Sequence, residues 1–231
     1  MKLYFGLILP LLLFSHISYG ENRPGFVCGQ FNKNIIEVPS EYVFPFAEYE
    51  GYSYFDPRFV ENKKGCEANF RILPMRMSWP EMKPIDSNEN IKIIRVSIEP
   101  LDGDVNGYLE YKRYLYLDRG EEKIKGEVLY DEKINLYFSD VELKRMKKNI
   151  DPEYYKNRYY WELKNNDVNT LFECIWIPFR QEYSDCDAIF LIENIGVKVR
   201  LNMIFDDLIM WEEIKNDIVI FLNQKMINRK W

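Results

Sequence analysis

Much of this chain alternates apolar and polar residues with a period of two, the pattern of a β-strand with one buried face. The clearest stretch is 91–99, where Ile94, Val96 and Ile98 mark the face expected to be buried. Other strands or hairpins are expected at 26–38, 72–79, 127–138, 159–163, 171–179, 187–193 and 197–203. Because few helices fall between these segments, the sheet should be mostly antiparallel and the fold class α+β.

A short middle helix is expected where a capping box, Ser139 with Glu142 three residues later, precedes residues 141–148. Residues 108–117 alternate like another strand, although a helix fits them nearly as well.

The C-terminal segment gives the clearest helical pattern. Asp206 or Asp207 is expected to cap a helix that ends near Met226. Its apolar stripe, which should pack on the sheet, consists of Trp211, Ile214, Ile218, Phe221 and Leu222. Ile209 and Ile220 fall on the opposite face; exposed apolar residues are common, and a partner contact is the alternative interpretation.

Residues 1–20 have the features of a cleaved secretory signal: a lysine, an apolar run and a small-x-small end. An uncleaved anchor is the alternative, but the apolar run is shorter than the ~20 residues that span a bilayer. Removing the segment changes the net charge from −6 to −7. The remaining 21–231 should form one globular domain; a separate N-terminal lobe over 21–88, ending in the polar loop 86–90, is the alternative.

The only histidine, His16, lies inside this leader, so the processed chain has none. Nucleophilic sites that use histidine as a base and zinc sites that use it as a ligand are therefore excluded. Phosphate-binding and dinucleotide-binding glycine motifs are also absent. No cofactor is expected, and any catalysis would depend on carboxylates, lysine, tyrosine or a carboxylate-bound metal.

Four cysteines in an exported chain predict disulfides. Proximity in the sequence favours Cys28 with Cys66 and Cys174 with Cys186 among the three pairings. A metal site is disfavoured because no Cys-x-x-Cys spacing occurs.

Asp102, Asp104 and Asn106 match the first half of a calcium-binding loop and resemble the EF-hand type. Its twelfth position, which should be a bidentate glutamate, is Arg113. A simple turn explains the same residues, because Asp, Asn and Gly all favour turns.

Residues 42–59 contain eight aromatic side chains in eighteen positions. Core packing with tight loops is the main interpretation, and a binding surface is the alternative. The surface would include Tyr49, Tyr52, Tyr54 and Phe55. Glu48 and Glu50 lie in the same stretch and are the candidate acid–base pair of a glycan hydrolase.

These observations favour an exported, non-catalytic protein of the bacterial periplasm or extracellular space that binds another protein, with an inhibitor or immunity-type protein as the concrete version. Its acidity suits a basic partner and disfavours nucleic acid. A carboxylate-based glycan hydrolase and a calcium-stabilised binding module are the alternatives.

Overall fold

The structure is a computed structural model that describes residues 22–85, 92–101, 103, 107–118, 123–143 and 156–227. The leader, the polar loop 86–90 and the calcium-loop residues Asp102, Asp104 and Asn106 lie outside the described residues.

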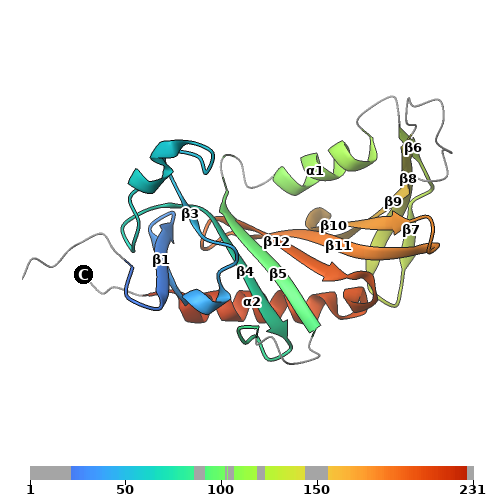
Figure 1. Cartoon of the computed structure of the whole chain (residues 1–231). Coiled ribbons are helices and arrows are strands. Elements are labelled where there is room, and N and C mark those ends of the chain that lie inside the picture. The colour runs from blue at the N-terminus through green and yellow to red at the C-terminus, as the bar shows by residue number, and fades with distance from the viewer. Residues whose placement is uncertain are drawn as a thin grey trace, which may run out of the picture.

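Most of the strands pair antiparallel in one large sheet (Figure 1). The sheet order is β3-β4-β5-β12-β11-β10-β9-β8-β6, with β7 also pairing with β8. The sheet strands are β3 (Glu48–Tyr49), β4 (Phe70–Trp79), β5 (Lys92–Pro100), β6 (Lys123–Lys125), β7 (Leu129–Asp131), β8 (Leu136–Leu143), β9 (Lys156–Lys164), β10 (Asp167–Ile177), β11 (Glu182–Ile192) and β12 (Val197–Ile204). The strand expectations for 72–79, 91–99, 159–163, 171–179, 187–193 and 197–203 are thus confirmed, and the 127–138 hairpin forms with a later turn.

A separate hairpin precedes the sheet. Strands β1 (Phe26–Phe31) and β2 (Asn34–Pro39) pair antiparallel across Asn32 and Lys33, as the sequence predicts. The disulfide Cys28–Cys66 ties β1 to the segment that leads into β4. The described part of the possible N-terminal lobe, residues 22–85, therefore contributes both this hairpin and strands of the main sheet, where β4 pairs directly with β5.

Helices α1 (Tyr108–Leu117) and α2 (Trp211–Lys225) lie on opposite faces of the sheet (Figure 1). Under α2, the strand register aligns Met75, Val96, Leu201 and Ala188 in one apolar row. The stripe of α2 that buries itself against this face is the expected one: Trp211, Ile214, Ile218, Phe221 and Leu222. No helix among the described residues is long and apolar enough to cross a membrane.

Three local expectations are wrong. Residues 108–117 form a helix rather than a strand, because a helical stripe buries Leu109 and Leu117 while Tyr111 stays exposed. The capping box does not start a helix at Val141, since β8 continues to Leu143 and pairs with β9. The short helix in the middle of the chain is α1, at Tyr108–Leu117, and not the expected one at 141–148. Residues 144–148 lie outside the described residues.

The N-terminus of α2 is the third correction. A 3-10 segment, η4 (Phe205–Met210), precedes it, and α2 begins at Trp211 without a side-chain cap. Asp207 is buried and forms an ion pair with Lys92 instead. Its carboxylate is held by a tertiary contact with β5, which the local sequence does not reveal.

Candidate binding groove

A row of five polar side chains crosses five adjacent strands on the face that carries α1. Direct pairing in the register places them side by side in the order Arg76, Arg95, Asn202, Asp187 and Glu173, which we call the charge row. Antiparallel partners have Cβ atoms about 4.5–5.5 Å apart, so each side chain can contact the next. The row therefore has two arginines at one end and two carboxylates at the other.

The charge row is held by an amide at its centre. Arg95 Nη1 donates to Asn202 Oδ1 at 2.9 Å, and Asn202 Nδ2 donates to Asp187 Oδ1 at 2.8 Å. The far end is held separately, because Tyr159 Oη and Asn157 Nδ2 both donate to Glu173 Oε1 at 2.9 Å. Every described acid in the row thus has a neutral donor.

The charges in this row are segregated rather than paired. Among the described residues, no carboxylate lies within ion-pair distance of Arg76 or Arg95, and no cation lies within that distance of Asp187 or Glu173. Like charges directly opposite on neighbouring strands destabilise a sheet. The fold therefore keeps two such pairs where alternating signs would have formed cross-strand ion pairs.

The charge row lines a groove of about 380 Å³. Phe44 and Tyr116 also line it, and the Arg76 guanidinium lies 5.1 Å from the Phe44 ring centroid. Other residues that line it include Ser97, Ile189, Pro74 and Arg200. Ser97 Oγ is buried and has no hydrogen-bond partner among the described residues, which is rare for a buried hydroxyl.

Helix α1 and the adjacent strand β12 add charge beside the groove. Glu99 accepts ion pairs from Lys198 Nζ at 2.8 Å and Arg200 Nε at 3.1 Å. Burial lowers the pKa of Lys112, and the nearby Arg200 and Lys198 lower it further. Burial, together with the negative charge of Glu173, raises the pKa of Tyr116 to about 12. Tyr116 therefore stays neutral at physiological pH.

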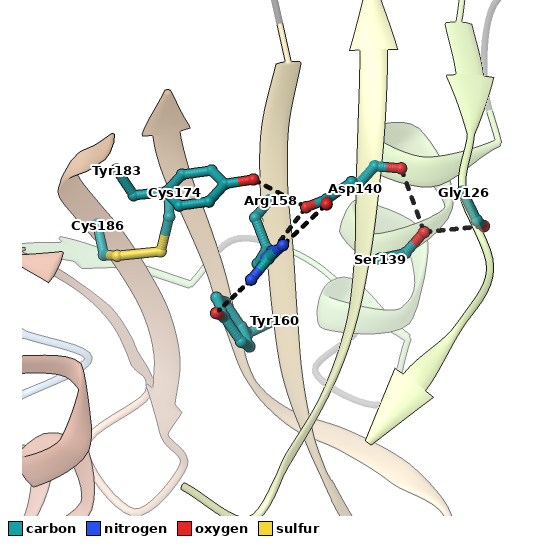
Figure 2. A network of polar contacts seen from close by, with 8 residues as sticks. All are labelled: Gly126, Ser139, Asp140, Arg158, Tyr160, Cys174, Tyr183 and Cys186. Atoms are coloured by element: carbon teal, nitrogen blue, oxygen red, sulfur yellow. Dashed lines mark hydrogen bonds and ion pairs between the residues drawn. A yellow bond between two sulfur atoms is a disulfide. The ribbon is translucent and has the colours of Figure 1, made fainter. Parts of the chain in front are cut away.

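The opposite face of the sheet has a network, formed by side chains of β8, β9 and β11, in which the charges are paired (Figure 2). Arg158 donates twice to Asp140, at 2.6 and 2.8 Å, and Tyr183 Oη donates to the same carboxylate at 2.9 Å. Burial alone would raise the pKa of Asp140, but the hydrogen bonds from Arg158 and Tyr183 hold it below its usual range. This network lies beside the Cys174–Cys186 disulfide, and its satisfied charges indicate a structural role.

Ser139 shows how the strand register overrides a local motif. Its hydroxyl donates to the carbonyl of Gly126 at 3.1 Å instead of capping a helix (Figure 2). The same residue is the direct partner of Tyr159, which in turn pairs with Glu173 of the charge row.

Both disulfides predicted from sequence proximity are present, Cys28–Cys66 and Cys174–Cys186. Cys174 and Cys186 are direct cross-strand partners on β10 and β11. One described group, Cys28, Glu37 and Cys66, has the spacing of metal ligands, but its two sulfurs are bonded to each other. That group therefore offers no thiolate to a metal.

The aromatic segment divides between core and surface. Tyr49 is buried, stacks on Phe70 and donates to the Cys28 carbonyl, so its assignment to a partner surface is wrong. Tyr52, Tyr54 and Phe55 are exposed, Phe55 to 93%. These three exposed aromatic side chains do not line the groove.

The remaining predicted site residues do not converge on the groove. Ile209, in the 3-10 segment that precedes α2, is 63% exposed, and Ile220, on α2, is 53% exposed. Both lie on the other face of the sheet. Glu50 accepts a hydrogen bond from Asn69 Nδ2 at 2.7 Å, and Glu48 lies on β3. Neither carboxylate belongs to the groove lining.

Sequence patterns did not reveal the groove, although one signal was present. The alternation in 91–99 places Arg95 and Ser97 on the face opposite the core residues, where the structure has them. The residues beside them come from distant segments. The register that aligns Arg95 with Arg76 and Asn202 cannot be predicted from the pattern of any one segment.

Comparison with known proteins shows a shared fold and no family. No protein-family description and no curated protein matches the sequence. One solved structure that resembles this chain is Smlt3025, an immunity protein of the Stenotrophomonas maltophilia type IV secretion system. The TM-score is 0.58, the sequence identity 14%, and the match covers 88% of this chain and 94% of that one. The chain therefore has an α+β fold that is similar over nearly its whole length to that immunity protein.

Proposed function

We propose that this chain is an exported immunity-type protein that binds another protein and neutralises it without catalysing a reaction. The observation on which this rests most is the charge row. Its like-charged pairs cost stability in the isolated fold, and complementary charges on a partner would offset that cost.

Two further observations support the proposal. The fold resembles that of an immunity protein over 88% of this chain. Two disulfides are typical of proteins that fold in an oxidising compartment, which fits the leader predicted at 1–20 and a periplasmic or extracellular location.

We place the primary contact at the groove and a secondary contact at the exposed aromatics Tyr52, Tyr54 and Phe55. Aromatic side chains are enriched in protein interfaces, where they fill pockets of the partner. Ile209 and Ile220 remain proposed contacts of a separate apolar patch.

Affinity capture tests this proposal. The processed chain with a C-terminal tag is incubated with envelope extract and secreted fractions of the organism that encodes it. The proposal predicts recovery of one protein in a stoichiometric amount, and inhibition of that protein's activity or toxicity on co-expression. Absence of any stoichiometric partner, or a captured protein whose activity is unchanged, would contradict it.

A further inference from the structure

Resting on the proposed function, we infer that the groove receives an extended segment of the partner with an acidic side chain and, four residues away, a basic one. The acidic side chain lies over Arg76 and Arg95, and the basic one lies over Asp187 and Glu173. The occupant is thus a dipolar peptide segment rather than a uniformly basic surface.

The spacing follows from the strand order. The midpoint of the arginine pair lies between β4 and β5, and the midpoint of the acidic pair lies between β11 and β10, with β12 in the centre. Strands in a sheet are about 4.8 Å apart, so the two midpoints are separated by about 14 Å. An extended chain covers about 3.4 Å per residue and shows every second side chain on one face, so residues four apart match this distance.

An extended backbone also suits the floor of the groove. Ser97 Oγ has almost no solvent-accessible surface, so the polar groups open to a partner here are the side chains of the charge row. An extended segment keeps free backbone N–H and C=O groups that can bond to the polar side chains of the charge row, whereas the backbone groups of a helix bond to one another.

The central Asn202 fixes the polarity of the site. Its carbonyl oxygen accepts from Arg95 and its amide donates to Asp187, so both amide groups are engaged in the orientation that matches the two charged ends. A partner with one sign of charge throughout would be attracted at one end and repelled at the other.

Four synthetic peptides test the charge order directly. The first, acetyl-Glu-Ser-Thr-Ser-Lys-amide, has the predicted spacing. The second, acetyl-Ser-Glu-Lys-Thr-Ser-amide, has the same composition with adjacent charges. The third and fourth carry glutamate at both ends or lysine at both ends. Each is titrated into the ¹⁵N-labelled processed chain at low ionic strength, and the shifts of backbone amides and arginine Nε–H groups are followed.

We expect the first peptide to bind about threefold or more tightly than each of the other three, with shifts centred on the charge row. Arg76→Glu should abolish the preference, and Arg71→Glu, a change at an exposed arginine of β4 outside the groove, should leave it intact. Arg76→Gln is the second variant, which removes the charge without adding another, and thermal unfolding confirms that each variant is folded.

Equal binding of the four peptides, shifts away from the charge row, or tightest binding by the doubly acidic peptide would overturn the inference. The proposed function fails separately, if affinity capture recovers no partner. A partner that is captured equally well by wild type and by Arg76→Glu would leave the proposed function standing and refute the inference.

Discussion

Arg76 and Arg95 lie directly opposite each other on β4 and β5, and among the described residues neither has a carboxylate within ion-pair distance. Two positive side chains thus face each other across a strand pair close to one edge of the sheet. Opposite charges at such positions stabilise a sheet, and like charges destabilise it. A substitution that removes the repulsion between these two groove arginines should therefore change the stability of the fold as well as binding in the groove.

Arg76→Glu should raise the free energy of unfolding by about 0.5–1 kcal/mol at low ionic strength, because it turns a repulsive cross-strand pair into an attractive one. Chemical denaturation at low and at high salt measures the effect, which should shrink with salt because the charges are accessible to solvent. Arg71→Glu is the matched control and should change stability little. A variant less stable than wild type at low salt would contradict this account of the arginine pair.

Asp140→Asn should lower the free energy of unfolding at neutral pH by about 1–2 kcal/mol, less than for a fully buried pair because both partners retain some access to water. The pKa of Asp140 is depressed in the folded state, so its contribution is present above the usual aspartate pKa and is lost as the pH falls through the folded value. The wild-type and variant curves should therefore converge in acid.

Unfolding experiments between about pH 2 and pH 7 measure this convergence. These limits lie about two units below and about three units above the usual aspartate pKa. Asp118→Asn serves as the control, since Asp118 forms an exposed ion pair with Lys125. A difference between wild type and Asp140→Asn that stays constant down to the lowest pH would show that the ion pair is not its origin.

How far the sequence predicted this fold depended on whether the signal was local. The strand at 91–99 and the stripe of α2 could be predicted because burial imposes a period of two or of 3.6 on neighbouring residues. The helix predicted from Ser139 failed because pairing with β9 outweighs a capping pattern. The charge row could not be predicted, because its members come from five separate strands that only the strand register aligns.

Replacing Cys174 and Cys186 together by alanine should cost about 3 kcal/mol, because the lost bridge closes a short loop in the unfolded chain. The same change at Cys28 and Cys66, which lie 38 residues apart, should cost about 4 kcal/mol. Denaturant titration of the two double variants gives both values. If the shorter loop proved to stabilise the protein more, loop closure would not be the main effect.

Ile218 and Ile220 form a matched pair on α2, one buried to 1% exposure and the other 53% exposed. Ile218→Ala should cost about 2–4 kcal/mol through lost burial and a cavity under the helix. Ile220→Ala should stay within about 0.5 kcal/mol of wild type. Thermal unfolding compares them, and reduced capture of a partner by Ile220→Ala at unchanged stability would support its proposed contact role. A large loss of stability in Ile220→Ala would contradict the observed packing of α2.

We propose above all that the groove binds a partner protein through its separated charges. The most direct measurement is the affinity of the captured partner for wild type and for Arg76→Glu, made by calorimetry at low ionic strength. Binding should be weaker by about tenfold or more in Arg76→Glu, a variant that should be at least as stable as wild type. Unchanged affinity in the folded variant would contradict it.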